Sequence, residues 1–378
     1  MGFRIFRHWT TRGLVLVQLA SVTMPALVKF NEGRDQLFVN AGMSIGYDSN
    51  IFASNGDEGD IFTNTSVGID YTRKAGIIGV SAGAGWNLGT FASNGESDFS
   101  NPKLNLEFSK DSGRTTGSLA ISSARESQAD PNVNLRTESW NHDIALNWKY
   151  PVIERYSLSG VLGYTWLDYI DNSAGFIDLN TYTASLDLAY AYTSARELFF
   201  GYRIRESDTS TGGSTTDHSL TGGINGKILP KLTGSIRLGY QLREDAATGD
   251  IYGSTNGEVS LTWSATKRIS VGLSLTKDFS TTATDSSLDS THLTLNTQYA
   301  LARQWSLSAS VGGGESTFFS GSDDGRNDRF FTATTGATFN INEHFTTSLT
   351  YSYFQNWSNQ ANSTFDRHSV TLNLSTNW

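Results

Sequence analysis

The sequence has no cysteine, only 5 proline residues among 378 and, beyond its first 28 residues, no long apolar run. Without cysteine there are no cysteine–histidine metal spacings, and the chain suits passage through an oxidising compartment in an unfolded state. A mean hydropathy of −0.32 excludes a bundle of transmembrane helices. Basic residues are also scarce: a net charge of −9 and a pI of about 5.2 argue against nucleic acid as a partner.

The first 28 residues differ from the rest of the chain. Arg4, Arg7 and Arg12 precede a short apolar segment, Leu14–Ala20, and this pattern is typical of a secretory signal peptide. The segment is too short to span a bilayer, which takes about 20 apolar residues. An interfacial or soluble helix is the alternative. We predict a signal peptide over residues 1–28, with the mature chain starting between positions 21 and 31.

From Gln36 onward, apolar and polar residues alternate with a period of two. One example is the set Leu232, Ile236, Leu238, Tyr240 and Leu242, which alternates with Thr233, Ser235, Arg237, Gly239, Gln241 and Arg243. Successive side chains of a strand point to opposite faces, so the alternation indicates strands whose faces meet different media. No segment keeps a helical period, and the sequence predicts an all-β chain. A soluble solenoid or propeller is the alternative, but such folds repeat residues as well as hydrophobicity.

The connections between these strands alternate between short and long. The short ones hold the Pro, Gly and charged residues that tight turns use, and they lie near residues 73–76, 110–113, 150–155, 194–197, 229–231, 265–267, 301–304 and 341–344. The longer polar tracts between them are Ala53–Gly59, Ser93–Asp98, Gln128–Arg136, Asp171–Asp178, Asp208–Ser214, Asp245–Ile251, Thr281–Ser287, Ser320–Asn327 and Ser358–Thr364. These connections join about 18 strands. The number becomes 16 if two weakly alternating segments are not strands; the weakest are Leu104–Phe108, Leu119–Ile121 and Leu220–Ile224.

Long loops on one side and short turns on the other are typical of outer-membrane β-barrels. The strand spacing leaves room for the about 9–11 residues that a tilted strand needs to cross a membrane. Aromatic residues gather near strand ends, and amphipathic rings prefer the membrane–water boundary. Unpaired strand edges in lipid would leave backbone groups unsatisfied, so the sheet must close. We therefore predict a single transmembrane antiparallel up-and-down β-barrel over residues 36–378, in the bacterial outer membrane, with both termini in the periplasm.

Two segments carry resemblances to known outer-membrane proteins. Trp378, on the apolar face of the last segment, resembles the C-terminal aromatic residue by which the barrel-assembly machinery recognises its substrates. The heptapeptide Gly46-Tyr-Asp-Ser-Asn-Ile-Phe52 resembles the opening of a family of bacterial outer-membrane β-barrel porins, some members of which are found with exopolysaccharide genes. The resemblance implies porin-like transport, with polysaccharide export as an alternative. It implies no catalytic residue.

Four arginines on the predicted lumen face are candidates to line a pore. Arg203 and Arg205 lie on one strand, and Arg237 and Arg243 lie two strands further on, so the four could form a basic wall. Because arginine arrays select for anions in pores, one hypothesis is a path for an anionic solute or an acidic polysaccharide. The alternative, which we favour, is that these arginines pair with carboxylates such as Glu206, Asp217 or Glu244.

The chain shows no sign of an enzyme. His142, His218, His292 and His368 fall near the outer ends of different strands, and adjacent residues such as His142 and Asp143 face opposite sides. Asp323 and Asp324 are a weak candidate for calcium, which needs about 6–8 oxygen ligands. A solvated loop is the better interpretation. We expect no cofactor and no metal.

Small lumen residues such as Ser306, Ser308 and Ser310 leave space, and about 18 strands enclose an aqueous channel unless loops fold in. The first reading is a passive channel for small hydrophilic solutes. The second is an exit pore for an exopolysaccharide, and the third is a structural or adhesive barrel with a plugged lumen. The expected partners are outer-membrane lipid, the assembly machinery, and small solutes or polysaccharide. The sequence leaves the oligomeric state open.

Overall fold

The structure, a computed structural model, describes residues 26–378 apart from residues 75, 171–174 and 247. Most of the described chain is β-strand. Within the described part, no helix is long and apolar enough to cross a membrane. The predicted signal peptide, residues 1–28, lies outside the described residues except for its last three, and it stays a prediction.

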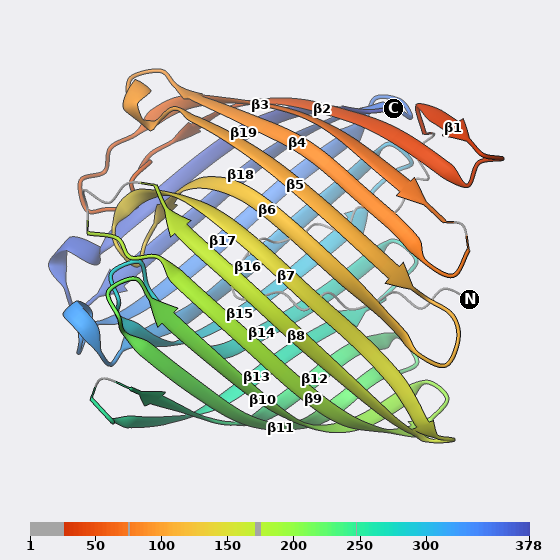
Figure 1. Ribbon diagram of the computed structural model, residues 1–378. Helices are drawn as coiled ribbons and strands as arrows, with labels where there is room; N and C mark the ends of the chain where they lie inside the picture. Colours follow the sequence, from red (N-terminus) through yellow and green to blue (C-terminus); the bar gives the residue numbers. More distant parts are fainter. Residues whose placement is uncertain (1–25, 75, 171–174, 247) are drawn as a thin grey trace.

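The strands follow one another around a single sheet in chain order (Figure 1). A short strand, β1 (Val28–Phe30), pairs only with the first long strand. The long strands are β2 (Asp35–Asp48), β3 (Asp60–Arg73), β4 (Gly79–Phe91), β5 (Phe99–Lys110), β6 (Thr116–Asp130), β7 (Leu135–Ile153), β8 (Tyr156–Tyr169), β9 (Leu179–Thr193), β10 (Arg196–Thr209), β11 (Ser214–Leu229), β12 (Leu232–Asp245), β13 (Ile251–Trp263), β14 (Ile269–Thr281), β15 (Ser287–Ala300), β16 (Trp305–Phe318), β17 (Asn327–Asn340), β18 (Phe345–Ser358) and β19 (Phe365–Asn377). Three 3-10 turns lie in loops: Gly95–Ser97, Gly321–Asp323 and Ala361–Ser363.

The sheet closes on itself between its last and first long strands. β19 pairs with β2 in antiparallel register from Ser369↔Asp48 to Asn377↔Asn40. The predicted all-β antiparallel barrel of 18 strands is therefore confirmed. The three segments with weak alternation lie within β5, β6 and β11, so each is a strand despite its weak pattern.

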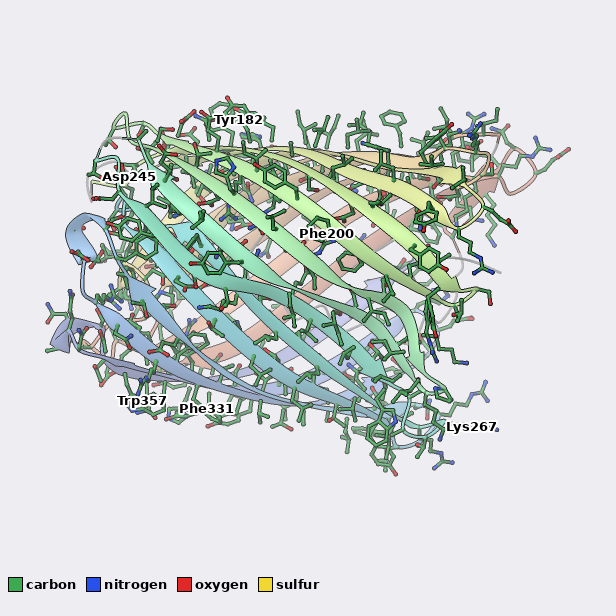
Figure 2. All side chains as sticks on the ribbon, turned by 90° about the horizontal axis from the view of Figure 1, so that it is seen from below. Tyr182, Phe200, Asp245, Lys267, Phe331 and Trp357 are labelled. Atoms are coloured by element: carbon green, nitrogen blue, oxygen red, sulfur yellow. The ribbon has the colours of Figure 1, made fainter. Side chains whose placement is uncertain are left out.

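The outer wall of the barrel is apolar. Leu188 and Leu238 leave 50% and 54% of their surface exposed, and similar values recur along the outer face of the other strands. Figure 2 shows Tyr182, Phe200 and Phe331 on this wall. Such exposure would cost about 25 cal/mol per Å² in water, but it costs nothing against hydrocarbon. The wall therefore suits a lipid environment.

The interior of the barrel is polar. Among its most buried side chains are Asp217, Gln241 and Arg243. Apolar side chains gather instead at the end that holds the long loops, where Leu167, Tyr169, Phe176 and Ala283 form a buried cluster. The buried apolar core is thus at one mouth of the barrel and not along its axis.

Long loops and short turns lie at opposite ends, at the left and right of Figure 1, and the C-terminus lies at the turn end. The asymmetry of this class makes the loop end extracellular and the turn end periplasmic. One predicted loop differs: in the tract Gln128–Arg136, β6 continues to Asp130 and β7 starts at Leu135, so only residues 131–134 form the loop. The two strands extend further because β6 and β7 stay hydrogen-bonded to each other after they separate from the neighbouring strands of the barrel wall.

Candidate pore constriction

The four arginines predicted to line the lumen lie on two strands that β11 separates. Arg203 and Arg205 belong to β10, while Arg237 and Arg243 belong to β12. All four alternate with exposed apolar residues, so their side chains point away from the lipid-facing wall. Arg203 also bonds to Asp278 on β14, which is not a neighbour of β10, and only a contact through the interior allows this.

Three of these arginines share two carboxylates. Arg243 donates to Asp217 from Nε at 2.6 Å and from Nη2 at 2.9 Å, and Arg205 Nε donates to the same carboxylate at 2.8 Å. Arg203 donates twice to Asp278, at 2.8 and 3.0 Å, and Arg205 Nη1 lies 3.1 Å from that carboxylate. The side chains of Asp217 and Arg243 are only 1% and 2% exposed. The cluster is therefore a buried network in which three cations face two anions.

Arg237 has a carboxylate of its own. It donates to Asp187 on β9 at 2.7 and 3.0 Å, and its guanidinium lies 4.3 Å from the centroid of the Phe199 ring. Two of the carboxylates suggested by the sequence, Glu206 and Glu244, are exposed and do not take part. The pairing removes most of the free positive charge that an anion-attracting wall would need. The structure thus favours paired arginines, with Asp217 as predicted and with Asp187 and Asp278 in addition.

The ladder between β13 and β14 stops before it reaches the extracellular end. Its last pair is Gly257↔Lys277, so residues 251–256 and 278–281 have no partner across this boundary. Open strand edges are not tolerated in hydrocarbon. Lys277, on the outer face at this point, forms an ion pair at 2.7 Å with Asp289. The polar outer face indicates that the gap lies at or above the lipid headgroups.

The arginine cluster takes the place of a neighbouring strand along this freed edge of β14. Arg205 Nη2 donates to the carbonyl of Phe279 at 2.7 Å, and Arg243 Nη1 donates to the carbonyl of Ser280 at 3.0 Å. Alternation would put the Phe279 ring on the outer wall, yet it is 2% exposed and lies 5.2 Å from the Arg243 guanidinium. The upper end of β14 is therefore tucked inside the barrel. The sequence gives no signal for this, because the alternation of β14 continues unbroken.

The tip of the β6–β7 hairpin also leaves the wall. Pairing with β5 ends at Lys103↔Ala124, and pairing with β8 ends at Ser139↔Tyr169. β6 and β7 nevertheless stay paired to each other up to the loop. The next residue on β5 is Pro102, which has no N–H to offer to a ladder. Residues 125–138, which we call the hairpin tip, can therefore depart from the sheet.

The hairpin tip lies against the inner wall of the barrel. The Arg136 guanidinium lies 4.8 and 5.4 Å from the ring centroids of Phe91 on β4 and Phe99 on β5. Arg136 also donates from Nε to the Ser127 hydroxyl at 3.1 Å, across the hairpin. Each cation–π contact contributes about 0.5–2 kcal/mol. These contacts fix the base of the hairpin tip inside the mouth.

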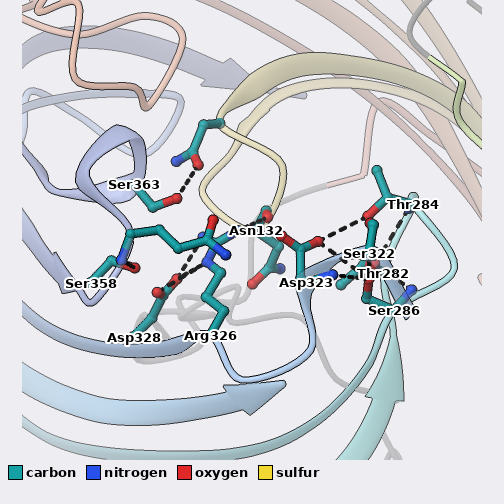
Figure 3. Close-up of polar contacts among 12 residues, drawn as sticks. Asn132, Thr282, Thr284, Ser286, Ser322, Asp323, Arg326, Asp328, Ser358 and Ser363 are labelled. Atoms are coloured by element: carbon teal, nitrogen blue, oxygen red, sulfur yellow. Dashed lines mark hydrogen bonds and ion pairs between the residues drawn. The ribbon is translucent and has the colours of Figure 1, made fainter. Parts of the chain in front are cut away.

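Arg326, in the loop between β16 and β17, holds the end of the hairpin tip (Figure 3). Its guanidinium donates to the carbonyls of Asn132 at 2.6 Å and Pro131 at 3.0 Å, and it is paired with Asp328 at 2.6 Å. Arg326 is 3% exposed. β16 lies on the far side of the barrel from β6 in the strand order, so this contact spans the mouth. We call Arg326 and the two carbonyls the latch.

Residues of four more loops lie next to the hairpin tip. Asn134 donates to the carbonyl of Ala53 in the β2–β3 loop at 3.0 Å and accepts a hydrogen bond from Ser363 in the β18–β19 loop at 2.6 Å. Val133 packs against the buried cluster that includes Phe176 and Ala283. The loops thus form a constriction across the extracellular mouth, and none of these contacts could be read from alternation.

The remaining candidate residues stay apart. The four histidines lie on β7, β11, β15 and β19, and two of them, His218 and His368, contact tyrosine hydroxyls at 2.6 and 2.8 Å. Asp323 accepts hydrogen bonds from Thr284 and Ser286 and lies 3.6 Å from Arg326. Within the described part of the chain, no group of three or more His, Asp or Glu residues could hold a metal ion.

Trp378 ends the chain at the periplasmic rim. Its N–H donates to the Val39 carbonyl at 2.9 Å, the Val39 N–H donates back at 2.8 Å, and its ring stacks on His344 with centroids 3.9 Å apart. The Trp378 backbone thus extends the seam between β19 and β2, and 40% of the residue remains exposed. Its predicted role as an assembly signal stays a proposal.

Known structures share the barrel fold. The chain is similar to OpdK from Pseudomonas aeruginosa, solved with vanillate, at 11% identity and a TM-score of 0.52, over 90% of this chain and 99% of that one. It is also similar to the FrpB iron transporter from Neisseria meningitidis at 10% identity and a TM-score of 0.50, over 86% of this chain. The match spans only 63% of the FrpB chain. At these identities the likeness concerns the fold alone. No curated protein matches the sequence.

A family model matches more directly. Residues 214–377 match the family described as Putative beta-barrel porin 2. These residues form β11–β19, which close one barrel with β2–β10. The wall, the paired interior and this match together make the protein a porin-like channel of the bacterial outer membrane, and the C-terminal part of the chain is similar to the Putative beta-barrel porin 2 family.

Proposed function

We propose that the barrel is a passive channel for small hydrophilic solutes. The observation that carries this proposal is the combination of a polar lumen with a constricted mouth. On β16, Ser306, Ser308, Ser310 and Gly312 alternate with the outward Leu307 and Val311, so this stretch of the inner wall offers hydroxyl groups and space. Hydroxyl groups hydrogen-bond to water and to neutral polar solutes alike. A mouth narrowed by the hairpin tip favours small solutes.

Charge along the lumen also supports a channel with weak selectivity. Besides the arginine cluster, Lys149 pairs with Glu197 at 2.6 Å, and Arg367 pairs with Asp48. Paired charges present little net field to a passing ion. The alternative of an exit pore for an exopolysaccharide rests on the family resemblance, and the interlocked loops favour the first reading over it. A deletion strain that loses its exopolysaccharide would support the export pore.

Single-channel recording tests the proposal. Purified barrel in a planar lipid bilayer should give discrete conductance steps, with an anion-to-cation permeability ratio near one because the lumen charges are paired. A barrel that inserts but gives no steps would contradict the channel and support a plugged structural barrel. A strong preference for anions would contradict the pairing and would support the hypothesis of a basic wall formed by Arg203, Arg205, Arg237 and Arg243.

We further propose that Trp378 acts as the C-terminal assembly signal. A chain that lacks only Trp378 should reach the periplasm but yield much less folded barrel in the outer membrane, because β19 then offers no terminal aromatic residue. The measurement is a detergent gel of unheated samples, on which folded barrel resists unfolding and can be quantified. Trp378→Phe is the matched control and should assemble normally. Equal assembly of the truncated chain would contradict the proposal.

A further inference from the structure

Basic residues gather at the periplasmic end of the barrel. Every turn from β3–β4 to β15–β16 carries or adjoins at least one lysine or arginine, and among these are Arg73, Lys74, Lys110, Arg114, Arg155, Arg196, Lys227, Lys231, Lys267, Arg268 and Arg303. The extracellular loops carry acids instead, among them Asp57, Glu58, Glu96, Asp98, Asp250, Asp285, Asp323 and Asp324. The periplasmic turns also hold the acids Asp111, Glu154 and Glu343, but bases outnumber acids there, so a chain with a net charge of −9 has a positive periplasmic rim. Figure 2 labels a residue of each end, Lys267 and Asp245.

The rim is most basic over three adjacent turns. Residues 194–196, 227–231 and 264–268, all described, contribute five bases and no acid. Lys231 Nζ donates to the carbonyl of Ala265 at 3.0 Å, and Arg196 Nε donates to the carbonyl of Lys227 at 2.8 Å. These bonds tie neighbouring turns together. Lys227, Lys267 and Arg268 are exposed.

An apolar groove lies on the outer wall directly beside these turns. Its volume is about 580 Å³, and it is lined by Leu229, Leu232, Leu261, Trp263, Val271 and Leu273, with Lys231 at its edge. Leu232 pairs with Trp263, Trp263 with Val271, and Leu261 with Leu273, so the groove crosses three strands. Trp263 is 49% exposed. The groove therefore opens toward lipid, just where the wall meets the basic turns.

We propose that this groove and its bases bind an anionic phospholipid of the periplasmic leaflet. An acyl chain lies along Leu232, Leu261 and Leu273, and the phosphate of the headgroup faces Lys267 and Arg268. Basic residues at a membrane surface attract anionic headgroups, and apolar residues next to them anchor the hydrocarbon. Trp263 sits at the boundary, where its ring is favoured. The site is separate from the lumen and does not depend on the channel function.

The apolar surroundings favour a lipid over an acidic protein as the occupant. Exposed apolar residues accompany the bases on other turns too, for example Ile77 at 69% and Ile153 at 63%. A soluble acidic partner would reach the bases from the periplasm but would leave the groove to other molecules. A phospholipid contacts both the bases and the groove, because its phosphate and its acyl chains belong to one molecule. The groove also lies within the membrane, where phospholipid is the abundant ligand.

Lipid binding to a matched pair of variants tests the proposal. The purified barrel is mixed with dioleoylphosphatidylglycerol or dioleoylphosphatidylcholine in detergent, and bound lipid is counted by native mass spectrometry. We expect the barrel to bind phosphatidylglycerol in preference to phosphatidylcholine. The variant Lys267→Gln/Arg268→Gln should weaken that binding about 25-fold, at about fivefold per base. Lys110→Gln/Arg114→Gln, on the β5–β6 turn, should change it little.

A groove variant separates the lipid from other anions. Leu273→Trp fills the groove, keeps every charge and remains apolar toward lipid, and it should reduce phosphatidylglycerol binding while the conductance stays unchanged. Equal binding of the two lipids, or equal weakening by both base variants, would overturn the specific site. Displacement of the lipid by inorganic phosphate at a similar concentration would reduce the site to a simple anion site. Retention of polyglutamate by Lys267 and Arg268 without lipid would assign the surface to an acidic protein.

Discussion

Arg326→Ala should convert the constricted channel into one that spends much more time in a wider state. The substitution removes the two hydrogen bonds from Arg326 to the Asn132 and Pro131 carbonyls, and it leaves the Asp328 carboxylate without its cation. Hydrogen bonds to a charged group contribute about 1.5–3 kcal/mol each. Loss of about 3 kcal/mol shifts a two-state equilibrium by roughly 100-fold. Single-channel recordings should therefore show long sojourns at higher conductance.

Arg329→Ala is the matched control for the latch. Arg329 lies three residues after Arg326, near the start of β17, but its side chain is 72% exposed and lies 3.5 Å from Glu315 on the outside. We expect no change in conductance from this variant. A second variant removes the constriction without depending on the latch: replacing residues 129–136 by an Asn-Gly turn, which is favourable in a two-residue hairpin. If both Arg326→Ala and the shortened hairpin conduct like the original barrel, the hairpin tip is not the constriction.

The fold could be predicted from the sequence because two media act on every strand. Alternation in segments such as Leu232–Asp245 follows directly from hydrocarbon on one face and water on the other. Strand number followed from turn chemistry, since Pro, Gly and charged residues mark the turns between strands. Even the weak segment Leu220–Ile224 is a strand, because its neighbours leave it no other place in a closed sheet.

The constriction could not be predicted, because it depends on where strands leave the sheet. The tract Gln128–Arg136 is polar and therefore predicts a loop, although all but residues 131–134 continue the two strands of the hairpin. Pro102 is the one local hint, since it interrupts the donors of β5 next to the point where β6 departs. Arg326 and Asp328 carry no periodic signal at all. Contacts across the mouth join residues nearly 200 positions apart, and spacing along one chain does not reveal them.

Asp217→Ala should destabilise the barrel more than any substitution on its surface. Asp217 is 1% exposed and pairs with both Arg205 and Arg243, which in turn hold the free edge of β14. Removal of one partner from a buried ion pair costs about 3–5 kcal/mol, because a charge is left without compensation. Urea unfolding of the barrel in detergent micelles measures the loss.

Glu32→Ala is the control, since the Glu32 and Arg34 side chains are 84% and 62% exposed, and an exposed pair contributes about 0–1 kcal/mol.

Asp217→Ala has a second consequence, which a simple loss of stability would not produce. Arg205 and Arg243 become partly free, so the lumen gains positive charge and the channel should shift toward anions. Asp217→Asn, which keeps an acceptor but not the charge, should show the shift in selectivity with a smaller loss of stability. A stability change below about 1 kcal/mol for Asp217→Ala would show that the arginines do not support the edge of β14.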